Sequence, residues 1–279
     1  MGETVNLSPS PRNGEGRRRA WRPGVAIWLS AGFHIAALIA LIARPPWWPS
    51  ILTAVVLNHV VLGLIGLWPR SRLLGANMLR LPDAAASRHE IALTFDDGPD
   101  PDVTPKVLDI LDSHQAKASF FVIGDKAAAH PELIREIVKR GHSIENHSRK
   151  HSSFFGFFAW TALREDIGTA QEIIAGITGQ APAFFRAPMG IRNPLVDPVI
   201  ARLGLRYITW TRRGFDTVTG DPAVVLQRLT RDLSAGDILL LHDRRTRHQR
   251  AMVLEVLPAL LNRIAAAGLK PVSLPLAMQ

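Results

Sequence analysis

Two uncharged, apolar runs lie near the start of the chain, over residues 25–43 and 50–68. Each is close to the roughly 20 residues with which a helix crosses a bilayer. The PPWWP sequence between them (45–49) cannot continue a helix, and it puts two tryptophans where a membrane interface favours them. The pattern predicts a transmembrane helical hairpin. A cleaved signal peptide is the alternative, but the first run is long for a signal core and a second run follows it.

Three polar side chains interrupt these runs: His34, Asn58 and His59. Polar residues inside membrane helices are commonly functional, yet they also form hydrogen bonds from one helix to its neighbour. We interpret these three as contacts between the two helices of the hairpin.

From residue 89 onward, short apolar segments alternate with longer segments of helical periodicity. Such a succession favours parallel strands covered by helices, and six or seven units suit a barrel better than an open sheet. The prediction is therefore an α/β fold, a distorted (β/α) barrel that follows the hairpin. We expect strands at 89–95, 118–123, 142–145, 183–186, 206–210, 237–242 and near Pro271, and helices at 104–113, 131–140, 160–178, 193–203, 222–234 and 249–267.

The chain of 279 residues divides into four expected parts. Residues 1–24 are polar and rich in Gly, Pro and Arg, which is typical of a disordered basic tail. Residues 25–68 form the two membrane helices, residues 69–88 a linker, and residues 89–279 the barrel domain, which is long enough to enclose a large core.

The formal charge of +9 is compatible with a nucleic acid, an anionic membrane or a phosphorylated substrate. Many arginines flank the apolar runs: Arg12, Arg17, Arg18, Arg19 and Arg22 before them, Arg44 between them, and Arg70, Arg72 and Arg80 after them. This bias predicts an inner-membrane protein with both ends, and hence the barrel domain, in the cytoplasm. The bilayer explains the charge and no nucleic-acid-binding motif is present, so we expect no nucleic-acid partner.

Two adjacent carboxylates, Asp96 and Asp97, end the first strand of the barrel. They repel each other unless a cation or a basic group neutralises one of them. His147 and His151 could supply further ligands to that cation, and the absence of cysteine leaves carboxylate and imidazole as the available ligand types. Catalytic residues of barrels lie on the loops after the strands, where we find Asp96, Asp97, His147, Arg186, Asp216 and His242.

Four motifs in this order resemble those of the polysaccharide deacetylase, or NodB-homology, family of carbohydrate esterases. They are TFDDG at 94–98, HSRKH at 147–151, FRAPMG at 185–190 and LLHD at 240–243, and the resemblance covers about residues 89–275. It implies a distorted (β/α) barrel, a divalent metal that is usually Zn²⁺, and hydrolysis of an N- or O-acyl group on a sugar.

The resemblance also implies roles for single residues. Asp97, His147 and His151 resemble the metal ligands, and Asp96, held ionised by the metal and by Arg186, resembles the general base. His242 resembles the acid that protonates the leaving amine, Asp216 the carboxylate that orients it, and the backbone N–H of Met189 an oxyanion donor. Such a set suits a metal that acidifies water and polarises an acyl group.

Departures from the family pattern surround the expected substrate and leave the metal site intact. Ala187, Met189, Arg213 and Thr217 replace residues that are common in the family, which argues against the usual groove for a sugar polymer. Arg213, Arg244 and Arg245 are expected to bind an anionic substrate group, together with Arg192, Arg212, Arg247 and Arg250 on the same face; a solvated basic rim is the alternative.

The predicted function is that of a metal-dependent hydrolase that removes an N-acyl group, expected to be acetyl, from a sugar carried on a lipid phosphate at the membrane. Deacetylation of a soluble or cell-wall polysaccharide or of a chitooligosaccharide is the competing enzymatic interpretation. A catalytically silent carbohydrate-binding module is the alternative from another class, because a fold does not guarantee turnover.

Overall fold

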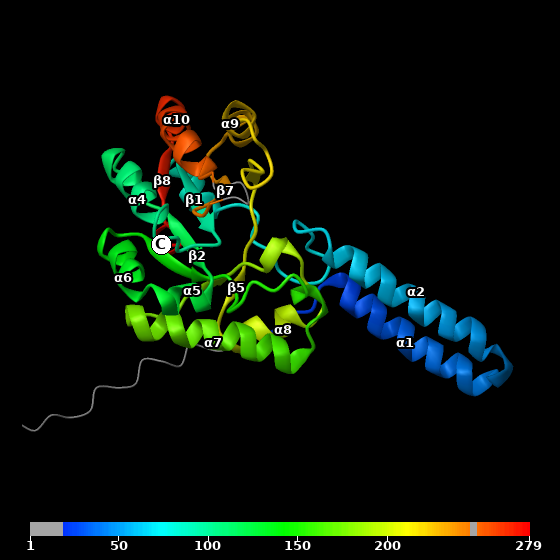
Figure 1. Cartoon of the computed structure of the whole chain (residues 1–279). Coiled ribbons are helices and arrows are strands. Elements are labelled where there is room, and N and C mark those ends of the chain that lie inside the picture. Colours follow the sequence, from blue (N-terminus) through cyan, green and yellow to red (C-terminus); the bar gives the residue numbers. More distant parts are fainter. Residues whose placement is uncertain (1–18, 246–249) are drawn as a thin grey trace, which may run out of the picture.

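The computed structural model describes residues 19–245 and 250–279 of the chain. Most of the expected basic tail (1–24) and Arg247 therefore lie outside the described residues. Figure 1 shows a rounded body of strands and helices from which a pair of long helices projects.

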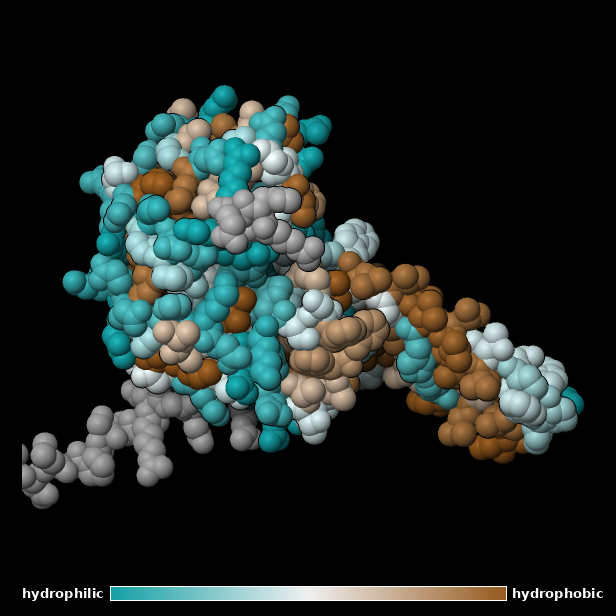
Figure 2. Space-filling model, viewed as in Figure 1, coloured by the Kyte–Doolittle hydropathy of each residue, from teal (hydrophilic) through white to brown (hydrophobic). Residues whose placement is uncertain are grey.

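The projecting pair is an antiparallel hairpin of α1 (Val25–Ala43) and α2 (Trp48–Gly66), joined by the short 3₁₀ turn η1 (Pro45–Trp47). Both helices are long and apolar enough to cross a membrane by length and composition. Their apolar side chains point outward on all sides, as for Leu29, which is 69% exposed, and Ile42, which is 74% exposed. Figure 2 shows the hairpin as the most hydrophobic part of the visible surface. A helix that is apolar all round is typical of a membrane span.

Polar contacts join the two helices near their middle. Asn58 Nδ2 donates to Ser30 Oγ at 2.8 Å, and the rings of His34 and His59 meet edge to face with centroids 5.2 Å apart. The interpretation of His34, Asn58 and His59 as contacts between the helices is thus confirmed.

The body is built around one sheet of eight strands, in which every strand pairing is parallel. The strands are β1 (Glu90–Asp96), β2 (Ser119–Val122), β3 (Ser143–Asn146), β4 (Phe184–Phe185), β5 (Arg206–Tyr207), β6 (Arg212–Arg213), β7 (Ile238–His242) and β8 (Lys270–Val272). Their order is β5-β4-β3-β2-β1-β7-β6, with β8 paired to the first half of β1. The ends of this order, β5 and β6, are not paired with each other in the described chain, so the barrel is distorted, as predicted.

The segment 69–88, expected to be a linker, packs against the body beside residues 207–211. Met78 forms a bridge with Ile208, and Thr211 Oγ1 donates to the carbonyl oxygen of Leu79 at 2.7 Å. Leu81 and Ala85 of the same segment are buried, the latter in the short helix α3 (Asp83–Ser87). This segment therefore covers the chain that connects the two unpaired sheet edges.

Helices cover the outer face of the sheet (Figure 1). They are α4 (Thr104–Ser113), α5 (Gly124–Ala129), α6 (Pro131–Lys139), α7 (Trp160–Thr178), α8 (Val196–Arg202), α9 (Pro222–Thr230) and α10 (Met252–Ala266), with the shorter η2 (Phe155–Phe157), η3 (Pro188–Gly190) and α11 (Leu274–Ala277). The sequence pattern locates α4 and α7 to the residue, because their apolar positions recur at helical spacing. It misses α3, α5, α11 and β6, which are too short to show a period.

Candidate active site and metal centre

The carboxyl ends of β1, β3, β4 and β7 bring the expected residues to one rim of the barrel. Asp96, the last residue of β1, stands in register with His242, the last residue of β7. Asn146 of β3 is paired with Phe185 of β4, so the residues that follow, His147 and Arg186, are neighbours as well. A pocket of about 100 Å³ opens there, lined by Asp96, Asp97, His147, His151, Met189, Gly190, Trp210, Arg213, Thr217, Leu240, His242 and Arg244.

Three of these side chains form a group suited to a metal ion. The possible ligand atoms of Asp97, His147 and His151 lie within 4.8 Å of one another. Asp97 Oδ1 lies 3.1 Å from His151 Nε2 and 3.4 Å from His147 Nε2, and this buried oxygen accepts no hydrogen bond within the described chain. Because a buried carboxylate oxygen without a hydrogen bond is costly, the donor set fits a bound cation.

Hydrogen bonding and charge also prepare the group for a cation. His147 Nδ1 lies 2.8 Å from the carbonyl oxygen of Arg186, to which it can only donate, so Nε2 is the ring nitrogen left to bind a metal. Burial alone would raise the pKa of Asp97, but the contact with His147 and the charges of His242 and His151 lower that pKa well below its ordinary value. Asp97 is therefore present as the carboxylate that a metal requires.

The loop 147–151 is held in shape by hydrogen bonds from α7 and within the loop. Asp166, a buried residue of α7, accepts from the backbone N–H groups of Arg149 and Lys150 at 3.2 and 3.3 Å. Ser148 Oγ accepts from the N–H of His151 at 3.0 Å. The backbone of His151 is left-handed (φ 51°), and these contacts hold it in that unusual conformation. Asp97, directly after β1, is also left-handed (φ 72°).

Asp96 is positioned by a fully buried guanidinium group. Arg186 Nη1 donates to Asp96 Oδ1 at 2.6 Å and to Thr94 Oγ1 at 2.9 Å, and its plane lies 4.1 Å from the centre of the Phe121 ring. The second carboxylate oxygen, Asp96 Oδ2, lies 3.7 Å from His147 Nε2 and so faces the metal-ligand group. One oxygen of Asp96 is thus held by Arg186, while the other is turned towards His147.

His242 is paired with the buried carboxylate of Asp216. Its Nδ1 lies 2.9 Å from Asp216 Oδ1, and its backbone N–H donates to Asp216 Oδ2 at 2.8 Å. Burial alone would lower the pKa of His242, but the Asp216 carboxylate and then Asp97 and Asp96 raise it above its ordinary value. The pair therefore favours the protonated imidazole that a general acid needs.

The rim of the pocket holds Met189, Arg213 and Arg244. The backbone N–H of Met189, in the left-handed region at φ 57°, donates no hydrogen bond to another described residue. The guanidinium of Arg213 lies over the rings of Trp210 and Phe215, at 5.1 and 4.7 Å from their centres. Arg244 Nε donates to Asp97 Oδ2 at 2.7 Å, so this arginine contacts the metal-ligand group directly.

Arg245 does not line the pocket, and its expected role in substrate binding stays a prediction. Its guanidinium pairs with Asp102 at 3.0 Å, and its backbone N–H donates to Asp100. Arg245 is thus bound to the acidic loop that follows β1.

Three further arginines expected on this face have carboxylate partners, whereas Arg247 lies outside the described residues. Arg192 binds Asp197, Arg212 binds Asp237, and Arg250 binds Glu255. Charge alone could not reveal this, because the sequence does not show which acid lies beside each arginine.

Several residues of the site were assigned no role from the sequence. Trp210 and Leu240 line the pocket, but Trp210 is predicted only as part of a strand, and Leu240 only as a member of the LLHD motif. The position of Asp166 could have been recognised from the sequence, because Asp166 lies between the buried residues Leu163 and Ala170 on the apolar face of α7. A carboxylate on such a face indicates a specific polar partner.

Comparisons with known proteins agree with this geometry. Residues 83–208 match the family model described as polysaccharide deacetylase. The chain is 34% identical over 155 residues to the peptidoglycan-N-acetylglucosamine deacetylase of Bacillus cereus, covering 55% of this chain and 72% of that one. It is 36% identical over 162 residues to the chitooligosaccharide deacetylase of a Bradyrhizobium species, covering 58% and 73%.

The similarity extends to solved structures. A peptidoglycan N-acetylglucosamine deacetylase crystallised with a hydroxamate-type benzamide superposes with a TM-score of 0.67 at 27% identity, covering 73% of this chain and 92% of that one. Membership of one protein family explains the barrel, the order of the motifs and the way in which their residues meet at one rim. The chain belongs to the polysaccharide deacetylase family of hydrolases, which act on carbon–nitrogen bonds other than peptide bonds.

Proposed function

We propose that this chain is a membrane-anchored, metal-dependent deacetylase that removes the acetyl group from an amide nitrogen of a sugar carried on a lipid phosphate. The observation that carries the proposal is the contact between the hairpin and the active-site rim. The backbone N–H of Arg192, three residues after Met189, donates to the carbonyl oxygen of Gly66 at the end of α2. Gly190 of the same loop packs against Pro69. A rim built onto the base of a membrane helix favours a substrate held at the bilayer.

In the proposed reaction Asp97, His147 and His151 hold the metal ion, for which we propose Zn²⁺. When bound, such an ion lowers the pKa of water and polarises an acyl carbonyl. Asp96 Oδ2 accepts the proton of the attacking water, while Arg186 keeps the carboxylate fixed. The free N–H of Met189 donates to the oxygen that becomes negative, and His242 protonates the departing amine.

The size of the pocket limits which part of the substrate enters it. At about 100 Å³ it is well below the roughly 300–1,000 Å³ of a pocket that encloses a drug-sized ligand. We infer that the acetamido group enters, while the remainder of the sugar stays at the rim beside Arg213. Arg213 lines the pocket and forms no ion pair with a carboxylate of the described residues, which supports binding of a phosphate oxygen there.

We further propose that the barrel domain faces the cytoplasm. Arg19 and Arg22 precede α1, and Arg70 and Arg72 follow α2, whereas the tip between the helices carries Arg44 alone. This asymmetry supports a cytoplasmic base of the hairpin. A reporter fused to the carboxyl terminus tests it: activity of a cytoplasmic reporter is expected, and activity confined to a reporter that works outside the cytoplasm would reverse the orientation.

A soluble or cell-wall glycan remains the second candidate substrate, because the relatives named above are deacetylases of peptidoglycan and chitooligosaccharides. Acetate release from purified full-length protein distinguishes the two. We expect release from polyprenyl-phosphate acetamido sugars in mixed micelles and little from soluble chitooligosaccharides. Release from the soluble oligomers alone would reject the lipid-linked substrate. Sugar binding without any acetate release at saturating zinc would instead indicate a silent binding module.

A further inference from the structure

A second and larger cavity, of about 790 Å³, lies where the hairpin joins the barrel, and it shares no lining residue with the catalytic pocket. Its walls are formed by residues just before α1, by the segment after α2, by residues of α8 and by the start of β5. Their arrangement is fixed by a bridge between Pro23 and Gly75 and by a hydrogen bond from the N–H of Gly24 to the carbonyl oxygen of Leu74. The cavity therefore lies at the foot of the two apolar helices.

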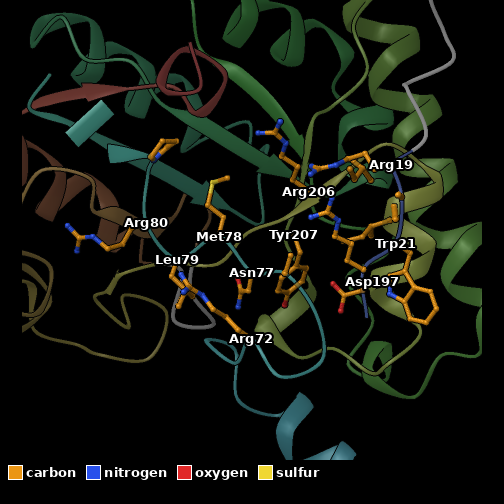
Figure 3. Close-up of a pocket in the computed structure, with 17 residues that line it drawn as sticks. Arg19, Trp21, Arg72, Asn77, Met78, Leu79, Arg80, Asp197, Arg206 and Tyr207 are labelled. Carbon is orange, nitrogen blue, oxygen red and sulfur yellow. The ribbon is translucent and has the colours of Figure 1, made fainter. Parts of the chain in front are cut away.

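The lining is strongly basic. Arg19, Arg22, Arg72 and Arg206 all reach it, and none of the four forms an ion pair with a carboxylate of the described residues. Figure 3 shows Arg19, Trp21 and Arg206 close together on one side of the cavity, while Arg80 extends away at the opposite end.

The acidic side chain in the lining does not neutralise these arginines. Asp197 is held by Arg192, whose Nη1 lies 2.9 and 3.0 Å from its two oxygens. Arg80, in turn, is paired with Asp237. Partial burial, and then the charge of Arg206, lower the pKa of Arg19 below its ordinary value, as expected for two cations placed together without an anion.

Apolar side chains complete the walls, among them Met78, Leu79, Ile200 and Leu205. A free inorganic anion would gain nothing from such walls, whereas a molecule with a charged head and an apolar body would gain from both parts. Tryptophan and arginine beside the ends of membrane helices are typical of the headgroup layer of a bilayer.

We propose that this cavity binds the phosphate-bearing headgroup of an anionic membrane lipid, with Arg19 and Arg206 on the phosphate and the apolar walls on the adjoining part of the lipid. The inference rests on the membrane anchoring proposed above. The lipid is a molecule separate from the substrate, because the two pockets have no residue in common. Its effect is to fix the foot of the hairpin, and with it the rim loop, at the membrane surface.

The test is native mass spectrometry of the full-length protein in mild detergent, titrated separately with phosphatidylglycerol, phosphatidylcholine and inorganic phosphate. We expect phosphatidylglycerol to bind at least about tenfold more tightly than phosphatidylcholine, because both offer a phosphate but the choline ammonium of the second is repelled by the arginines. The double variant Arg19→Gln/Arg206→Gln is expected to lose this preference. Arg231→Gln, which removes an exposed arginine outside the cavity lining, is expected to keep it.

Several outcomes would overturn the proposal. These are equal binding of the two lipids to the unaltered protein, an unchanged preference in the double variant, an equal loss in Arg231→Gln, or displacement of phosphatidylglycerol by an equal concentration of inorganic phosphate. The last result would identify a soluble anion as the ligand. Circular dichroism and metal content verify that the double variant is folded, and Arg206→Gln alone replaces it if it is not.

Carbonate extraction of membranes separates this inference from the proposed function. If the chain is released into the soluble fraction, membrane anchoring itself fails. If it stays in the membrane while phosphatidylglycerol shows no preference, only the lipid site is rejected.

Discussion

The two pockets of this protein differ in how their charges are balanced. In the catalytic pocket, Arg186 is paired with Asp96, Arg244 with Asp97, and His242 with Asp216. In the cavity at the foot of the hairpin, Arg19 and Arg206 lie together without a carboxylate partner among the described residues.

This difference indicates whether the charges of each pocket are already neutralised before a ligand binds. Opposite charges in the catalytic pocket fix one another before substrate arrives, which is the preorganisation that catalysis requires. The arginines of the second cavity repel one another until an anion arrives from outside. Variants that remove one charge at a time should therefore behave in opposite ways in the two places.

The largest expected effect is loss of the metal-ligand group. His147→Ala removes the imidazole between Asp97 and Asp96, and we expect loss of bound metal and a fall in kcat of about 10³-fold or more. Asp96→Asn is expected to keep the metal and lose about 10²- to 10⁴-fold in kcat, as for removal of a general base.

Elemental analysis and acetate release measure both effects. His114→Ala serves as the control, because it removes an exposed histidine outside the pocket lining and should change neither quantity. Full metal content in His147→Ala would contradict the assigned ligands.

Removing an arginine from each pocket tests the comparison most directly. Arg186→Met leaves the buried Asp96 carboxylate without its partner, so we expect a loss of about 3–5 kcal/mol in the free energy of unfolding. Arg206→Gln, measured without anionic lipid, should change that free energy by less than about 0.5 kcal/mol or increase it, because it removes a repulsion. Thermal unfolding in the same detergent measures the difference, and equal destabilisation by the two variants would refute it.

A smaller effect is expected in the dependence of activity on pH. In the proposed reaction His242 acts in its protonated form, and its pKa is raised by Asp216, so kcat should fall as pH rises through that pKa. Asp216→Asn removes the main partner that raises the pKa, and the decline in kcat should then begin at a lower pH. Profiles of kcat against pH for the two proteins check this, and a decline that stays in place would show that another group controls it.

The smallest expected effect concerns the link between hairpin and rim. A Cβ atom on Gly66 would lie 2.0 Å from the carbonyl oxygen of Arg192, whereas one on Gly63 would meet nothing within 4 Å. Gly66→Ala must therefore displace the rim loop, and we expect kcat/KM to fall about tenfold, which corresponds to about 1.4 kcal/mol.

Gly63→Ala is the matched control, because it adds the same methyl group to the same helix and should leave activity unchanged. Acetate release from membrane-inserted protein is the measurement. Equal activity in the two variants would show that the hairpin does not position the rim.

Much of the fold could be predicted from local patterns. The helices α1, α4 and α7 begin and end at the expected residues, because their hydrophobic periodicity or length is strong. The strands β5 and β6 could not be predicted as two separate strands, since two residues carry no period and Arg212-Arg213 has no apolar pattern. The role of residues 69–88 was equally hidden, because it depends on contact with residues 207–211, which are distant in sequence.

The amino-acid sequence by itself determined the chemistry available to this protein: which acids, imidazoles and arginines follow each strand, and that two apolar runs precede them. Only the tertiary structure decided how these groups are paired. Arg244 forms an ion pair with Asp97 and Arg245 one with Asp102, although the two arginines are adjacent in the sequence. Arg19 and Arg206, by contrast, lie close enough for their like charges to interact. The physical reason is that electrostatic interaction depends on distance in space and on burial, and neither can be read from position along the chain.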